Sequence, residues 1–148
     1  MSPAILPKGP PPSLHVLKEI AKAREEEFHS LVGRRHFAGA IISAALAVEA
    51  ILKARICRHL DVPTLPDFMF IHDLRRLWTV AGLDGEVRKK TAFGERLDSL
   101  RCYIEDPQRG DVRYRNPAQV TEDEVRRLSD WAFRSDLGAV PFIRNAIP

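Results

Sequence analysis

The chain has 148 residues, of which 45% are hydrophobic, so it can form a single domain with its own core and is too apolar for a disordered protein. The formal net charge is only +3: residues 1–60 hold nine basic and five acidic side chains, and the remainder fourteen basic and fifteen acidic. A protein that binds chiefly by neutralising phosphates would have a stronger basic excess, so the charge permits a nucleic-acid partner without requiring one.

Residues 1–12 contain five prolines and one glycine. This composition predicts a disordered, polyproline-like leader, with the globular domain at residues 13–148. The leader has no compact apolar segment of the kind found in a signal peptide, which favours a cytoplasmic location.

The first expected helix covers residues 14–32. Ser13 follows the last proline and can cap it, apolar residues recur at helical spacing, and Gly33 ends it. A second helix, from about residue 36 to 60, is almost entirely Ala, Ile, Leu and Val. Because Glu49 and Lys53 interrupt this run, we expect a buried helix and no membrane span.

Three further segments complete the pattern. A short helix is expected from near His72 to Gly82, and another in parts of residues 85–103, which Gly94 weakens. The last begins after Thr121, which forms a T-x-x-E capping box with Glu124. No stretch alternates with period two, so the prediction is an all-α, antiparallel bundle of four to five helices.

Cys57 and Cys102 lie far apart, and neither belongs to a CxxC pair. The histidines are not clustered. We therefore expect no metal site, no disulfide framework and no cofactor, which suits a reducing compartment.

Glu49 and Lys53 are four residues apart with the acid first, the favourable order for a pair within a helix. One interpretation is a salt bridge at the edge of the apolar face, worth a few tenths of a kcal/mol if exposed. The other is a charged pair inside a cleft or dimer seam, where an unpaired carboxylate would be costly.

The order of several motifs resembles the HEPN family of small all-α bundles. A long helix with an "A…A.E..LKA" pattern is followed by an "H-[DS]-L..L" segment, and an Arg-Tyr or Arg-Asn element precedes the last helix. The matching residues are Ala40, Ala44, Ala47, Glu49, Leu52, Lys53 and Ala54, then His72, Asp73, Leu74 and Leu77, then Arg113, Tyr114, Arg115 and Asn116. The resemblance implies a four- to five-helix bundle that is usually a homodimer and acts on or beside RNA or a nucleotidyltransferase partner.

Ribonucleases of this family share an R-x4-6-H motif at the start of the final helix, in which arginine stabilises phosphoryl charge and histidine transfers a proton. Arg115 and Asn116 begin such a motif, but no histidine follows them anywhere in the chain. The missing histidine argues against catalysis by this mechanism and favours a protein that is not an enzyme, with a divergent ribonuclease as the alternative.

Two other pairs come close to the motif. Arg24 and His29 have the right spacing, but five residues turn them about 140° apart on a helix. Arg55 and His59 share a face with one residue too few between them. The first pair is interpreted as a chance match and the second as a solvated helix edge.

His72 follows a proline-containing loop and is expected to cap the third helix, with a role as catalytic base as the alternative. The best aromatic and basic cluster is Tyr103, Arg113, Tyr114 and Arg115, because arginine binds phosphate and tyrosine stacks on a base. The opposing interpretation is a loop that ties helix ends together, since residues 101–116 sum to only +1.

Three functions follow from these observations. The first is a non-catalytic, dimeric helical module that binds RNA, a nucleotide or a partner protein of a toxin–antitoxin or nucleotidyltransferase system. The second is a divergent metal-independent ribonuclease that uses His72 or Tyr114 in place of the missing histidine. The third is a structural, antitoxin-like partner.

Overall fold

The computed structural model describes residues 9–89, 91–105, 112–136 and 138–147. These segments contain seven α-helices and three short 3₁₀ helices and no β-strand, which confirms the all-α prediction. The α-helices are α1 Leu14–Gly33, α2 Phe37–His59, α3 Leu74–Val80, α4 Asp84–Arg88, α5 Ala92–Glu105, α6 Glu122–Phe133 and α7 Ala139–Asn145. The 3₁₀ helices are η1 Asp67–Met69, η2 Val112–Tyr114 and η3 Pro117–Gln119.

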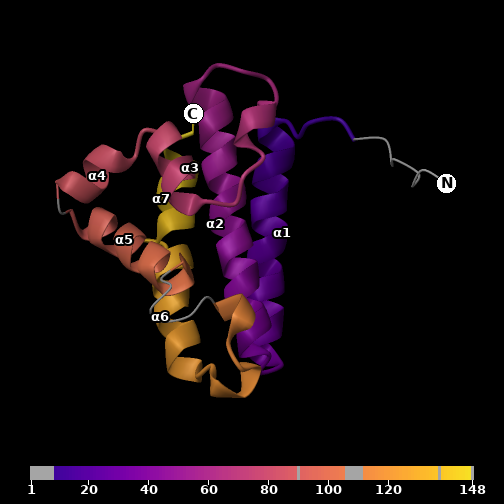
Figure 1. The fold of residues 1–148 in the computed structure, drawn as a ribbon, viewed down its shortest axis with the longest axis vertical. Coiled ribbons are helices and arrows are strands. Elements are labelled where there is room, and N and C mark those ends of the chain that lie inside the picture. The colour runs from indigo at the N-terminus through magenta and orange to yellow at the C-terminus, as the bar shows by residue number, and fades with distance from the viewer. Residues whose placement is uncertain (1–8, 90, 106–111, 137, 148) are drawn as a thin grey trace.

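Helices α1 and α2 form an antiparallel pair that runs the height of the molecule (Figure 1). Ser13 caps α1 by accepting a hydrogen bond from the Val16 amide. The two helices are joined by a tight turn at residues 34–36, in which Arg35 has a φ of 61°. These boundaries agree with the sequence prediction to within one or two residues.

Helix α2 lies at the centre of the bundle and contacts α1, α3, α6 and α7. By length and composition alone this helix could cross a membrane, a test that the core helix of a soluble protein also passes. In this protein 61% of its most apolar window is buried.

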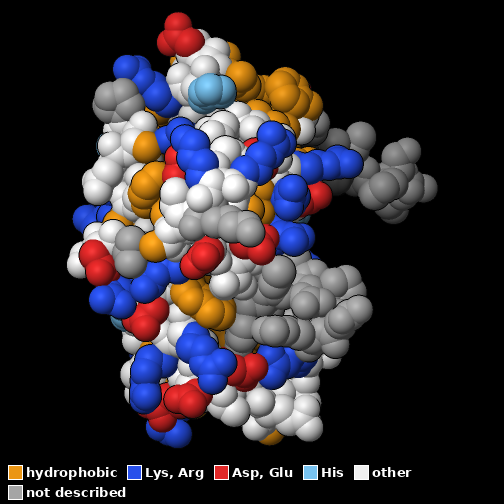
Figure 2. Space-filling view, turned by 90° about the vertical axis from the view of Figure 1, so that its left-hand side faces the viewer, with side chains coloured by type: hydrophobic (Ala, Val, Ile, Leu, Met, Phe, Trp, Pro, Cys, Tyr) orange, Lys and Arg blue, Asp and Glu red, His pale blue; other side chains and the backbone are white. Residues whose placement is uncertain are grey.

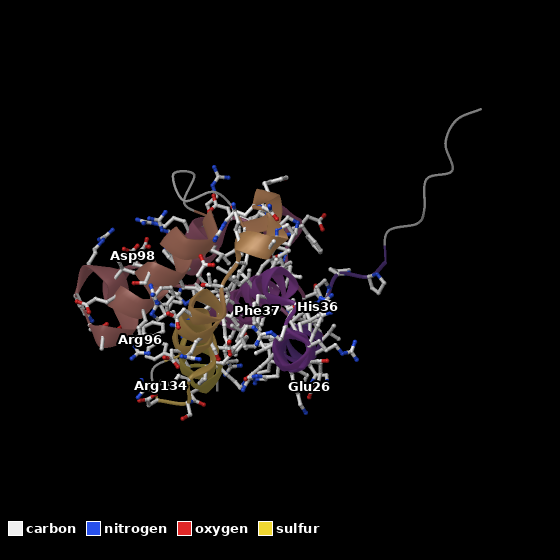
Figure 3. All side chains as sticks on the ribbon, turned by 90° about the horizontal axis from the view of Figure 1, so that it is seen from below. Glu26, His36, Phe37, Arg96, Asp98 and Arg134 are labelled. Carbon is white, nitrogen blue, oxygen red and sulfur yellow. The ribbon has the colours of Figure 1, made fainter. Side chains whose placement is uncertain are left out.

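Helices α6 and α7 together run antiparallel to α1. At the lower end, Arg35 approaches Glu122 at the start of α6, with 3.5 Å between their charged atoms. Farther up, Glu25 of α1 approaches Arg144 of α7, also at 3.5 Å. Seen from below, α1 and α2 lie on one side, α6 and α7 in the middle and α5 on the other side (Figure 3).

The segment predicted as one fourth helix is two helices, α4 and α5. Thr91 directly precedes α5. Its hydroxyl accepts a hydrogen bond from the Gly94 amide and donates one to the Glu86 carbonyl. Gly94 does not weaken the helix but lets it touch α4, because a Cβ there would collide with the Glu86 carbonyl and lie 3.0 Å from the Val87 Cα.

Helix α7 was not expected from the sequence. Pro141 lies at its third residue, in the first turn, where a helix needs no amide donor from the residue. Gly138 precedes it in a turn so tight that a Cβ would lie 2.6 Å from backbone atoms of Arg134. Glycine and proline are both common in loops, so Gly138 and Pro141, three residues apart, give this segment a local pattern that does not indicate a helix.

The predicted leader enters the fold at its end. The Pro12 carbonyl accepts a hydrogen bond from the Leu65 amide, and Ser13 forms an isolated bridge with Thr64. The start of α1 is thereby tied to the loop that follows α2. Residues 1–8 of the leader lie outside the described residues.

The side of the molecule on which α4 and α5 lie carries a mixed surface (Figure 2). Basic and acidic side chains alternate across it, with hydrophobic atoms between them. The described residues drawn on this face therefore form no broad positive area for a nucleic-acid backbone.

The close approach of α4 and α5 predicts the effect of substituting Gly94. Gly94→Ala should lower the free energy of unfolding by about 1–3 kcal/mol, because the methyl group must displace the α4 backbone. Urea denaturation of each variant measures its free energy of unfolding. The matched control is Gly85→Ala, where the new methyl group meets no atom within 4 Å. Equal stability of the two variants would contradict the packing described here.

Candidate functional site

Glu49 and Lys53 form an ion pair halfway along α2. The Lys53 Nζ lies 2.6 Å from the Glu49 Oε1, and the two side chains are only 9% and 12% exposed. This pair is too deeply buried to be the solvated edge pair that the spacing also allowed. In such an environment each charge depends on the other for its stability.

His72 adds a third member to this cluster. Its Nδ1 lies 3.0 Å from Oε1 and 3.1 Å from Oε2 of Glu49, whereas its ring is 78% exposed. The expectation that His72 caps the third helix is wrong: Asp73 is the N-cap of α3, accepting a hydrogen bond from the Arg76 amide. The histidine side chain is turned the other way, onto α2.

The loop from α2 to α3 brings His72 to Glu49. It crosses the top of α1 and returns along α2 (Figure 1). Glu49 and His72 are 23 residues apart in the chain, so no helical spacing relates them. All three residues stand out in the sequence, but their contact depends on the path of the loop, which no local pattern predicts.

The arrangement orients one imidazole. When Nδ1–H donates to Glu49, Nε2 is left as an acceptor on the exposed side of the ring, the arrangement found in carboxylate–histidine pairs that transfer protons. Lys53 meanwhile balances the charge of Glu49. Chemically, the cluster can hold one histidine in a fixed tautomer at the surface.

A small cavity of about 210 Å³ opens beside the ion pair, between α1, α2 and the loop. Its polar lining consists of Glu49, Lys53 and Arg24. The remaining lining residues are apolar, namely Pro12, Leu17, Ile20, Leu46, Ala50, Leu65 and Phe70.

The predicted Arg-Tyr-Arg-Asn element lies apart from this cluster, at the lower end of the bundle. Arg115 forms an ion pair with Glu124, 2.9 Å between Nη2 and Oε1, and each side chain is 22% exposed. Glu124 also completes the predicted capping box with Thr121. Asn116 caps η3 by accepting from the Ala118 amide. Arg115 therefore holds the loop to α6, and Asn116 fixes the start of η3 within the loop.

Arg113 and Tyr114 point outward from the same element. Tyr114 is 86% exposed, and the Arg113 guanidinium lies 5.8 Å from the centre of its ring. Tyr103 belongs to α5, but its side chain lies outside the described residues. Of the four residues in the predicted aromatic and basic cluster, two are thus presented to solvent.

A cleft of about 640 Å³ adjoins this element, between η3 and the turn from α1 to α2. Its lining includes Arg34, Arg35, His36 and Phe37, together with Pro117 and Ala118 of η3. His36 and Phe37 are labelled at the start of α2 in Figure 3. Sequence analysis did not select these residues, although an Arg-Arg-His run at a helix boundary was a visible signal.

The two approximate arginine–histidine motifs have structural roles. Arg24 pairs with Glu27, and the His29 ring packs 5.9 Å from the Phe133 ring. The Arg55 Nε donates a hydrogen bond to the Ala81 carbonyl at 2.7 Å, which fixes the end of α3. Neither pair converges on a common site.

Cys57 is buried, and burial raises the pKa of its thiol, so it is not an activated nucleophile. Among the residues with described side chains, no three His, Cys, Asp or Glu groups are placed to hold a metal ion.

No known protein family, curated protein or solved structure matches this chain. The resemblance to HEPN domains therefore stands on the motifs named above.

The buried ion pair predicts a stability effect that depends on both partners. Lys53→Met should lower the free energy of unfolding by about 3 kcal/mol, because Glu49 would keep only the exposed His72 as a partner. Glu49→Leu combined with Lys53→Met should recover most of that loss, since no buried charge remains. Urea denaturation of the single and double variants gives the coupling energy. Additive effects would show that the pair does not interact.

Proposed function

We propose that this protein is a non-catalytic helical module that binds single-stranded RNA or a nucleotide at the lower end of the bundle. One observation carries the proposal: the cleft that includes Arg34, Arg35, His36 and Phe37 adjoins the turn that exposes Tyr114. The supporting argument is chemical, since cationic and aromatic groups in one place are what phosphates and unstacked bases require.

The two parts of this surface are close together. Tyr114 precedes Pro117, which lines the cleft, by three residues, a span of at most about 11 Å. The turn from Tyr114 to Pro117 is held against α6 by the ion pair between Arg115 and Glu124. An exposed ring on a fixed turn can stack on a base with little loss of conformational entropy.

The charges on this surface set its affinity. Arg34, Arg35 and Arg113 contribute positive charge, and Glu122, which lies 3.5 Å from Arg35, offsets part of it. Few phosphates can be neutralised here. The expected ligand is therefore a short single-stranded segment or a nucleotide, bound by stacking together with one or two phosphate contacts.

Binding of a short fluorescent RNA oligonucleotide, followed by anisotropy, tests the proposal. Tyr114→Ala should weaken binding about tenfold through loss of stacking. Arg35→Asn should weaken it and reduce the salt dependence, and asparagine tolerates the φ of 61° at this position.

Arg127→Gln is the matched control, because it removes one exposed positive charge from α6 outside the cleft. Equal weakening by Arg127→Gln and Arg35→Asn, with no effect of Tyr114→Ala, would show unspecific charge attraction and contradict the site. If the protein binds neither RNA nor a nucleotide, that result would instead favour binding of a partner protein, such as a nucleotidyltransferase or a toxin.

The homodimer remains a prediction from the resemblance. Most apolar side chains of α2 are buried in its own bundle, whereas Phe37, Ala38, Ile42, Ala45 and Leu46 are half-buried, so a dimer that uses α2 would have to contact these residues. Light scattering on the purified protein measures its mass.

A second candidate function is metal-independent RNA cleavage by a divergent ribonuclease. The contact of His72 with Glu49 favours it, because this contact leaves Nε2 available as a base. In such a reaction Nε2 takes the proton of a ribose 2′-hydroxyl, whose oxygen attacks the adjacent phosphorus. The 5′-oxygen then leaves and is protonated from solvent.

This candidate predicts cleavage in the presence of a metal chelator. His72→Ala should abolish the activity, whereas His15→Ala, which removes another exposed histidine, should not change it. Gel analysis of diverse RNAs provides the measurement. RNA that remains intact with the unmodified protein, or activity that survives in His72→Ala, would exclude His72 as the base.

A further inference from the structure

We propose that the cavity beside Glu49 and Lys53 is a binding site for a small amphipathic monocarboxylate, with an apolar body of about one aromatic ring. This site is separate from the lower cleft, and the inference does not depend on the proposed RNA binding.

The cavity has the right walls for an apolar body. Leu17, Ala50 and Leu65 form buried parts of its lining, at 3%, 5% and 2% exposure, and Ile20 and Phe70 are more exposed. An apolar cavity of about 150 Å³ can hold a benzene ring. About 210 Å³ therefore accommodates a ring together with a carboxylate group.

The ammonium group of Lys53 has N–H donors at this cavity that the described residues do not bind. Its ammonium group carries three N–H donors, and among the described residues it bonds only to Glu49. A lysine side chain that is 9% exposed has little water to satisfy the rest. A ligand oxygen in the cavity would accept one of these hydrogen bonds.

Arg24 supplies a second cation. Its Nη1 bonds to Glu27 at 2.6 Å, and the described part of the chain provides no acceptor for its other nitrogens. The charged side chains that line the cavity are Lys53, Arg24 and Glu49. Each cation is paired with one carboxylate, Lys53 with Glu49 and Arg24 with Glu27, and each has more N–H donors than that one ion pair uses. A ligand carboxylate would bind through these remaining donors.

Glu49 does not prevent anion binding. Its Oε1 accepts from Lys53, and both of its oxygens lie within 3.1 Å of the His72 Nδ1. The carboxylate is thus held by two partners of its own. The ligand carboxylate would be placed between Lys53 and Arg24, with its apolar body against Leu17 and Phe70.

Phenylacetate and its neutral analogue phenylacetamide test the site, because they differ in charge and hardly in shape. Calorimetry and ligand-observed NMR on the full chain should show phenylacetate binding at about 1 mM or tighter. Phenylacetamide should bind at least about tenfold more weakly. Equal binding of the two, or no binding of either, would overturn the proposal.

Substitutions at Arg24 and in the cavity wall locate the binding. Arg24→Gln should weaken phenylacetate binding about tenfold, whereas Arg127→Gln, an equal loss of charge on α6 outside the cavity, should leave it unchanged. Ala50→Leu should abolish binding by filling the cavity. If circular dichroism shows that Ala50→Leu is not folded, Leu46→Phe, which fills the cavity from a less buried wall, is measured in its place. Binding that is unaffected in folded Arg24→Gln and cavity-filling variants would show that the ligand binds elsewhere.

Discussion

The buried ammonium group of Lys53 constrains the centre of this protein, because a charge in an apolar core must have a partner. α2 is surrounded by α1, α3, α6 and α7, and a lysine there with no partner would cost several kcal/mol. Glu49, one turn earlier, supplies the charge at 2.6 Å. The carboxylate in turn holds His72, so the loop between α2 and α3 is anchored to the helix that it leaves.

This chain of contacts connects structure with possible function. The loop that His72 anchors also forms one wall of the small cavity beside α1, through Leu65 and Phe70. The Glu49–Lys53 pair therefore determines both the orientation of an exposed imidazole and the polar part of a cavity. The RNA surface proposed at the lower end depends on a different ion pair, between Arg115 and Glu124. Each region is positioned by a partly or fully buried charge pair and presents other groups to solvent.

The interpretation of the Arg-Tyr-Arg-Asn element changes when its contacts are known. The sequence offered two alternatives, a ligand site and a loop that ties helix ends together. Both apply, to different residues: Arg115 and Asn116 make the structural contacts, whereas Tyr114 is exposed beside Arg113. The order of these motifs is what resembles the family. What each residue can bind depends on the contacts that its own side chain already makes.

The sequence by itself determined the helical class, the two long helices, the cap at Ser13 and the capping box at Thr121, because these features depend on residues within one or two turns. The Glu49–Lys53 pair was predictable for the same reason. Only the tertiary structure decided that this pair is buried, that His72 meets it across 23 residues, and that Gly94 lies at a contact between two helices, where the sequence predicted only a weakened helix. It also decided which arginines face solvent. Such features depend on how segments distant in the sequence pack together, and the spacing of neighbouring residues does not predict this packing.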